Sequence, residues 1–393
     1  MNNWKEATFD SLLSNIVDNR GKTCPTAEVG IPLIATNCIR NNNLYPVFEK
    51  VRFIDDETYK SWFRGHPEPG DMVFVTKGTP GRVCWVPDPV SFCIAQDMVA
   101  IRADESKVYP KYLFAALRSP QIQGQIEGLH VGSLIPHFKK GNFNELIIPI
   151  PPTPIQRYIG DMYLDFSLKI DLLHRQNQTL EQIAEALFRQ WFVEEADESW
   201  EIGTLDDVLT VKGGTTPSTK NPDDWDGDIH WTSPRDITTL NSIYLFDTER
   251  KITEAGLRKI SSGLLPKGTL LMSSRAPVGV LAFAEVPIAI NQGYIAILDE
   301  KGFSKEFLFL WLKTNMGYVQ SYANGSTFLE ISKSAFKSLE IQIPPEELRK
   351  EFQEWVIPYF KKIKSNQTQI RTLTALRDTL LPKLMSGEVR VDI

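Results

Sequence analysis

Cysteine is scarce in this chain and confined to its first half. The four cysteines are Cys24, Cys38, Cys84 and Cys93, and no two of them form a Cys-x-x-Cys pair. A disulfide framework or zinc site that supported the whole chain would need cysteines in both halves. The simplest interpretation is four reduced and mostly buried thiols.

The chain also lacks long apolar runs. No run reaches the roughly 18 residues that a membrane span needs, and the N-terminal segment, residues 1–6, lacks the basic and then apolar order of a secretory signal. We therefore expect a cytoplasmic protein with no membrane partner. The net charge of −6 argues against a protein that simply coats nucleic acid, although local basic loops can still bind a specific DNA sequence.

Motifs for catalysis are missing. The sequence contains no GxxxxGK[ST] loop, no GxGxxG after a strand, no GxSxG elbow and no (D/N)PP(Y/F) tetrapeptide of the kind that holds a flipped adenine. The five histidines show no metal-ligand spacing. We therefore expect no catalytic residue, no metal site and no cofactor in this chain.

What the sequence does contain is a long internal repeat. An offset of 193 residues carries Phe143 onto Phe336 and the pair Pro151–Pro152 onto Pro344–Pro345. The same offset carries Gly132–Ser133 onto Gly325–Ser326. A repeat of this length is a duplicated domain rather than a solenoid unit. A duplicated domain indicates a duplicated task, such as two binding sites in one chain.

Each copy divides into a β-rich globule and a long helix. Short β-patterned runs separated by glycine and proline fill the globules, and a Pro-Pro pair closes each one. We predict an α+β fold with globules at 1–153 and 199–347, a first spacer helix at 154–198, and a second spacer helix with a tail at 348–393.

Apolar residues in both helices recur at alternating spacings of three and four, which predicts a coiled-coil seam. Opposite net charges, −5 over 154–198 and +4 over 348–393, favour pairing of the two helices with each other within the chain. A pseudo-twofold chain would pair them antiparallel. The predicted interface comprises Ile159, Met162, Phe166, Ile170, Leu173, Asn177, Leu180, Ile183, Leu187, Phe352, Trp355, Tyr359, Ile363, Asn366, Ile370, Leu373, Leu376 and Leu380.

Two asparagines interrupt this apolar pattern. Asn177 and Asn366 can lie in the core, where an asparagine fixes register at a cost in stability, or at a wet edge of the seam. A helix of about 36 residues would span roughly 54 Å. We expect a kink at Pro358 and the end of regular helix, or a final bend, at Pro382, with Gly387 helping to stop the helix.

The ordered set of phrases resembles the specificity subunit of type I restriction–modification enzymes. The likeness rests on the Gly-Ser to Pro-Pro stretches 132–152 and 325–345, the turn-and-strand 70–74 with its counterpart 268–272, the stretches 273–279 and 291–293, and the closing segment 381–388. It covers essentially the whole chain, although no single phrase is decisive.

The resemblance implies a DNA-binding subunit with two target-recognition domains, each reading one half of a bipartite, asymmetric site in double-stranded DNA. The helix pair would set the spacing of the half-sites and dock two methyltransferase (modification) subunits. Two restriction (translocase) subunits can join such an assembly in host defence. S-adenosylmethionine, ATP and Mg²⁺ would belong to those partners, and this chain would be non-catalytic.

Polar and basic loop residues are the candidates for DNA contact, because Arg, Lys, Asn, Gln, Ser and Thr read base edges and phosphates. The plain alternative for each is a solvated loop. Since the net charge is negative, we expect weak DNA binding by the chain alone. The candidates are Arg40, Asn41, Asn42, Asn43, Lys77, Thr79, Arg82, Lys139, Lys140, Lys212, Thr215, Thr216, Arg235, Ser274 and Arg275.

Two other function classes remain open. A non-enzymatic scaffold, with two protein-interaction modules on a coiled-coil spacer, would share this architecture and differ only in what the loops touch. A self-contained nuclease or methyltransferase ranks third, because its motifs are missing. The two half-site sequences cannot be read from the chain.

Overall fold

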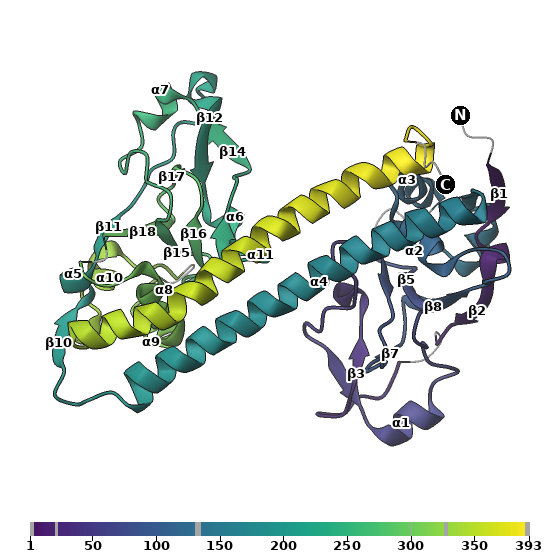
Figure 1. Ribbon diagram of the computed structural model, residues 1–393, viewed down its shortest axis with the longest axis horizontal. Helices are drawn as coiled ribbons and strands as arrows, with labels where there is room; N and C mark the ends of the chain where they lie inside the picture. Colours follow the sequence, from purple (N-terminus) through teal and green to yellow (C-terminus); the bar gives the residue numbers. More distant parts are fainter. Residues whose placement is uncertain (1–3, 20–22, 130–134, 300, 326–328, 390–393) are drawn as a thin grey trace. The chain divides into compact units, whose positions relative to one another are not determined.

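The computed structural model describes residues 4–19, 23–129, 135–299, 301–325 and 329–389. The chain folds into two compact units, Met1–Leu173 with Gln369–Ile393, and His174–Thr368. Each unit contains one globule and a stretch of each long helix (Figure 1). Of the recurring Gly-Ser pairs, Gly132, Ser133 and Ser326 lie outside the described residues.

The first globule is a mixed structure of short strands and helices. Its elements, in chain order, are β1 (Lys5–Thr8), η1 (Asp10–Leu12), β2 (Leu13–Val17), β3 (Ile31–Ile34), η2 (Thr36–Cys38), β4 (Arg52–Ile54), α1 (Asp56–Ser61), β5 (Met72–Val75), β6 (Val83–Trp85), β7 (Cys93–Ile94), β8 (Met98–Ala103), α2 (Pro110–Arg118), α3 (Pro120–Leu129), η3 (Lys140–Glu145) and β9 (Ile147–Ile150).

Three sheets build this globule. They have the orders β2-β8-β5-β6, β4-β3-β7 and β1-β9, and within them only β3 and β7 pair in parallel. Strand β5 is buried on both faces, so its alternating side chains enter two cores. Phe74 packs in the same cluster as Phe143, whereas Val73 and Val75 pack in the same cluster as Ile94.

The second globule repeats this plan. Its elements are β10 (Glu201–Thr204), α5 (Leu205–Val208), β11 (Thr210–Lys212), η5 (Pro222–Asp224), β12 (Trp225–Thr232), α6 (Pro234–Thr238), β13 (Tyr244–Leu245), β14 (Arg250–Ile252), α7 (Glu254–Leu257), β15 (Leu270–Ser273), β16 (Leu281–Ala284), β17 (Ile288–Ile290), β18 (Tyr294–Asp299), α8 (Lys305–Thr314), α9 (Met316–Ser321), α10 (Lys333–Lys337) and β19 (Glu340–Ile343).

Its sheets have the orders β11-β18-β15-β16-β13, β14-β12-β17 and β10-β19. Apart from the added edge strand β13, this is the topology of the first globule, strand for strand, including the parallel pair β12–β17 that corresponds to β3–β7. The predicted tandem duplication of an α+β domain is therefore confirmed.

Two long helices follow the globules. Helix α4 (Thr153–Arg189) continues into a π-helical turn, η4 (Gln190–Glu194), and α11 covers Glu346–Ser386. Helix α11 runs through Pro358 and Pro382 without interruption, so of the two alternatives at Pro382 the end of regular helix was wrong: the helix ends four residues later, at Ser386. Gly387, at φ 72°, follows the helix directly, and its N–H donates to Leu384 O.

The two helices run antiparallel inside each unit. In the second unit, Phe188 contacts Phe352 and Asn177 contacts Asn366. Residue numbers therefore increase along one helix where they decrease along the other, as in an antiparallel pair. In the first unit, Ile170 and Leu173 form a buried cluster with Ile370 and Leu373, and farther along Ser167 contacts Arg377.

Several predicted seam positions are exposed instead. Trp355 is 56% exposed, Leu376 45% and Ile183 40%. The buried residues are the next ones in the chain, Val356, Arg377 and Ala184. Both helices also cover the globule cores, so the side that is buried toward their ends differs from the apolar stripe that the spacing predicts. The same one-residue shift buries Tyr163, Ser167, Phe188, Phe360 and Leu381.

The cysteines are all buried and unbridged, as predicted. Burial raises the pKa of the Cys84 and Cys93 thiols to about 12, so both are protonated at neutral pH. Within the described ranges, no helix has the length and apolar character that crossing a membrane would require.

Candidate nucleic-acid interface

Polar loops of the second unit converge at one edge of its sheets. Strands β12 and β17 are parallel, so their carboxyl ends meet, and Asn291 N–H donates to Thr232 O at 3.0 Å. The loop after β15 joins the same edge, because Ser274 N–H donates to Gly293 O at 2.8 Å. Three loops that are distant in the sequence are thereby fixed to one another by backbone hydrogen bonds.

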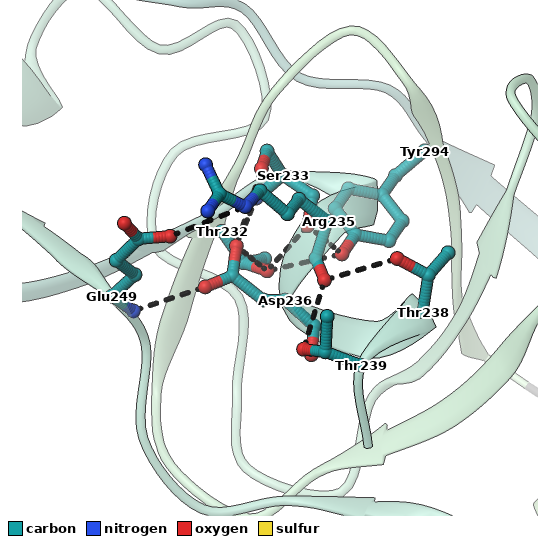
Figure 2. A network of polar contacts seen from close by, with 8 residues as sticks. All are labelled: Thr232, Ser233, Arg235, Asp236, Thr238, Thr239, Glu249 and Tyr294. Carbon is teal, nitrogen blue, oxygen red and sulfur yellow. Dashed lines mark hydrogen bonds and ion pairs between the residues drawn. The ribbon is translucent and has the colours of Figure 1, made fainter. Parts of the chain in front are cut away.

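Arg235 lies on this edge, at the start of α6 (Figure 2). A capping box holds the turn: Ser233 N–H donates to Asp236 Oδ2 at 2.8 Å, and Asp236 Oδ1 accepts from Glu249 N–H at 3.0 Å. Tyr294 O–H also donates to Ser233 O, at 2.6 Å. Burial raises the pKa of that phenol, which keeps it a donor. The backbone of this turn is thus fixed, while the Arg235 side chain is 77% exposed.

The candidate loop after β11 lies on the same edge. Thr216 Oγ1 donates to Gln292 Oε1 at 2.7 Å, and Thr215 Oγ1 donates to Lys259 O at 2.9 Å. Lys212 is exposed at the end of β11. The loop therefore presents Lys212 at its start, and its two threonine hydroxyls already have protein partners.

Ser274 and Arg275 follow β15 directly. Ser274 is 3% exposed, and its Oγ has no hydrogen-bond partner among the described residues. Arg275 Nη1 lies 3.8 Å from Glu330 Oε2. Ile331 N–H donates to Ser274 O at 3.0 Å, so this turn is clamped between the 291–293 loop and the 329–331 segment.

The first unit builds the same clamp after β5. Thr76 N–H donates to Asp97 O at 2.9 Å, and Phe138 N–H donates to Thr76 O at 2.9 Å. Thr76 thus corresponds to Ser274, and its buried Oγ1 also has no partner among the described residues. Lys77 consequently occupies the position of Arg275, with its Nζ 3.7 Å from Asp97 Oδ1.

Matching glycines close the two turns. Gly81 N–H donates to Val75 O at 3.0 Å, and Gly279 N–H donates to Ser273 O at 2.8 Å. Their φ values are 89° and 98°, a conformation that side chains rarely adopt. Recurrence of these glycines therefore reflects the turn rather than base reading.

The remaining candidates of the first unit surround this turn. Asn41 Oδ1 accepts from Val83 N–H at 3.0 Å, and Arg40 forms an ion pair with Glu49. Arg118 is buried and donates to the carbonyls of Asn43 and Val83, which fixes the 40–43 loop. The other candidates here are Asn42, exposed, and Thr79 and Arg82, both half-buried in the turn.

Lys139 and Lys140 are exposed at the start of η3. Lys140 Nζ lies 3.9 Å from Asp18 Oδ2, beyond the end of β2. The 193-residue offset carries Lys140 onto Lys333, which the sequence-based selection missed. A methyl group on Gly213 would lie 3.0 Å from Lys333 Nζ, so this lysine belongs to the edge of the second unit. The repeat itself was the clue that could have found it.

Five of the cations at these edges share an electrostatic feature. Arg40, Lys77, Lys140, Arg235 and Arg275 each have a carboxylate within 4 Å, and all but the first of these pairs are 3.7–3.9 Å long. Exposed ion pairs of this kind contribute about 0–1 kcal/mol to the stability of a protein, so a DNA phosphate could replace the carboxylate at little cost in free energy. Within the described chain, no group of three or more His, Cys, Asp or Glu side chains could hold a metal ion.

The helix pair contributes a buried polar contact in the second unit. Asn366 Nδ2 donates to Asn177 Oδ1 at 2.9 Å, with the two residues 0% and 7% exposed. Of the two placements that the sequence left open for these asparagines, the structure has the buried one. Asn366 Oδ1 has no partner among the described residues.

Comparison with known proteins places both copies in one family. A family profile, the type I restriction modification DNA specificity domain, matches residues 19–182 and 197–375. The MjaIX specificity subunit of Methanocaldococcus jannaschii is 37% identical over 186 residues, or 47% of this chain and 43% of that relative. The HindI specificity subunit of Haemophilus influenzae is 24% identical over 99% of this chain and 100% of its own.

The fold has a solved counterpart. The crystal structure of the type I restriction–modification S subunit from M. genitalium superposes with a TM-score of 0.60 at 18% identity, covering 97% of this chain and 96% of that one. This likeness supports the fold. Because the family profile covers most of both copies, this chain belongs to the type I restriction modification DNA specificity domain family.

Proposed function

We propose that this chain is the non-catalytic specificity subunit of a type I restriction–modification enzyme, and that it acts on DNA in the cytoplasm. Each globule reads one half of a bipartite, asymmetric site through its loop edge. The observation that carries this proposal is the same clamped turn at both edges, with Lys77 at one and Arg275 at the other.

Differences around this shared turn support two different half-sites. The first edge adds the Arg40–Asn43 loop, which a buried arginine fixes, whereas the second adds Lys212 and the Arg235 turn. Lys and Arg on such loops can contact guanine edges or phosphates, and asparagine suits adenine. A common frame with different reading side chains is what two different half-sites require.

The partners in this proposal are double-stranded DNA and two methyltransferase subunits, which dock along α4 and α11. Two restriction subunits can join them. S-adenosylmethionine, ATP and Mg²⁺ would then be bound by the partners. Exposed apolar residues on the two helices, Leu172, Ile183, Trp355 and Leu376, suit such docking, because exposed apolar surface favours protein association.

The test compares two matched variants in the complex assembled with the methyltransferase. Arg275→Ala should relax recognition of one half-site, and Lys77→Ala should relax recognition of the other, with a cost of about 1–3 kcal/mol if each contacts a base. Methylation of a library of substituted sites measures both. Equal loss at both halves for either variant would contradict the assignment.

A scaffold with two protein-binding modules is the second candidate. It predicts no methylation phenotype for either variant and no DNA in the purified complex. The apolar helix residues fit both candidates, so the half-site assay decides between them.

A further inference from the structure

The second unit contains a cavity of about 710 Å³ that the proposed function does not use. It lies between the first half of α11, the turn before α8 and the end of β16. Among the described residues its lining includes five lysines, namely Lys301, Lys305, Lys350, Lys361 and Lys364, against three glutamates. The cavity is therefore locally cationic, in a chain whose net charge is −6.

One carboxylate of the protein, that of Glu285, already pairs with an ammonium group of the lining. The Glu285 side chain is only 4% exposed, and its Oε2 lies 2.6 Å from Lys364 Nζ and 3.3 Å from Lys267 Nζ. A buried carboxylate is tolerated there only because cations surround it. The wall of the cavity is thus already built to hold a carboxylate between ammonium groups.

Two lysines of the lining remain available. Lys350 forms an ion pair with Glu346 at 2.6 Å. Lys305 and Lys361 have no carboxylate within 4 Å in the described ranges. They lie on separate elements, α8 and α11, on two walls of one cavity. Incoming acidic groups could pair with each of them without displacing an existing partner.

Apolar and aromatic side chains also line the cavity. Phe283, Ile357 and Phe360 belong to the lining, and Tyr244 O–H donates to Phe360 O at 3.0 Å, which fixes the backbone of α11 there. Polar and apolar lining together suit a peptide segment that carries both acidic and apolar side chains, rather than a bare inorganic anion.

The position of the cavity argues against DNA as its occupant. Strand β15 ends at Ser273, on the edge with Arg275, and β16 runs antiparallel to it. Lys267 precedes β15 and Glu285 follows β16, so both lie at the opposite end of this sheet from the candidate DNA contacts.

We propose that this cavity binds an acidic peptide segment of a partner protein, with Lys305 and Lys361 as the pairing cations. The first copy differs at these positions, because the 193-residue offset places Leu168 and Asp171 where the second copy has Lys361 and Lys364. The proposal does not depend on which DNA sequences the loops read.

The test uses the intact chain and a fluorescein-labelled peptide of alternating glutamate and leucine. Fluorescence anisotropy at an ionic strength of about 0.05 M, where charge pairs are weakly screened, should give saturable binding of one peptide per chain. Lys361→Glu should weaken binding about tenfold, which corresponds to about 1.4 kcal/mol. Lys305→Glu should have a similar effect.

Lys362→Glu is the matched control. Lys362 is exposed on the same helix, one residue away, and does not line the cavity. Lys362→Glu should change the dissociation constant of the peptide by no more than about twofold, since it makes the same change of charge at a distance from the cavity. Equal weakening by the Lys361 and Lys362 variants, or no binding to the wild type, would overturn the proposal. Circular dichroism verifies that each variant is folded.

Competition with duplex DNA shows whether the cavity binds an acidic peptide or DNA. If duplex DNA displaces the peptide, and Lys361→Glu weakens the duplex equally, the cavity is a DNA contact and the proposal fails. Half-site recognition measured with Arg275→Ala is independent of both results, so failure of this inference and failure of the proposed function are distinguishable.

Discussion

The buried asparagine pair of the helix seam allows a quantitative prediction. In the second unit, Asn366 is fully buried, and its Nδ2 bonds to Asn177 Oδ1 at 2.9 Å. Its other contact in the seam, with Gln176 Oε1, is 3.4 Å long. Replacing Asn177 with leucine would leave the Asn366 amide with only this long contact.

Removing one partner of a buried hydrogen bond costs about 1–3 kcal/mol, whereas replacing both partners by apolar groups is nearly neutral. Asn177→Leu alone should therefore destabilise the protein by about 1–3 kcal/mol. The free energy of unfolding of the double variant Asn177→Leu/Asn366→Leu should equal or exceed that of the wild type, because this variant also removes the unpartnered Asn366 Oδ1. With the double variant near the wild type, the coupling energy of the pair equals the summed cost of the two single variants, and so exceeds the cost of Asn177→Leu alone.

Urea unfolding of the wild type, both single variants and the double variant measures this coupling. A coupling energy near zero, with the double variant as unstable as the sum of the single ones, would refute the buried pair. Ile363→Ala serves as a control, since it truncates a buried apolar residue of the same helix and should cost about 2–5 kcal/mol.

Glu330→Gln removes the carboxylate beside Arg275, so specific DNA binding by the assembled complex should strengthen severalfold in an equilibrium binding assay; unchanged affinity would argue against phosphate exchange at this pair. The Cys84 thiol, with a pKa of about 12, should resist Ellman's reagent at pH 8 until urea unfolds the protein, and rapid native reaction would contradict its burial. Burial opposes the ionised form of Asp161, but hydrogen bonds from Lys111 and a tyrosine outweigh this effect and hold the pKa below its usual value. Its contribution to stability is therefore present above the unfolded pKa of about 3.9 and lost as pH falls through the folded pKa, so Lys111→Met should destabilise at pH 7 and have less effect near pH 3.

Inserting one heptad into each long helix is expected to change the number of unread base pairs between the half-sites and to leave their sequences unchanged. A heptad preserves the apolar pattern on each helix, so the seam can re-form. Methylation mapping with the altered subunit measures the spacing. An unchanged gap would contradict the spacer role of the helices.

The duplication could be predicted in detail because equivalent residues of the two copies are separated by a constant offset of 193 residues. The offset that joins Phe143 to Phe336 also joins Lys140 to Lys333, and the structure places both lysines at loop edges. The sheet orders were not predicted, since most of the strands have only two to four residues and leave almost no periodic pattern to read.

The helix seam was predicted correctly near its middle and only in part toward its ends. Ile170, Leu173 and Phe352 are buried as the pattern indicates, but Ile183 and Trp355 are exposed. A fixed alternation of threes and fours does not account for the globule cores that the same helices cover.

The candidate contacts required tertiary information. Arg118 fixes the Arg40–Asn43 loop from a helix 75 residues away, and no local pattern reveals such a support. The equivalence of Lys77 and Arg275 likewise appears only through the matching backbone hydrogen bonds that clamp their turns. Sequence alone selected both residues without relating them.

The most direct test of the specificity role is the adenine-methylation map of the source genome, with the gene present, deleted and restored. The account predicts that one bipartite motif loses methylation on deletion and regains it on restoration. Restoration with Arg275→Ala should broaden only one half of that motif. An unchanged map, with the chain expressed and bound to a methyltransferase, would contradict the account.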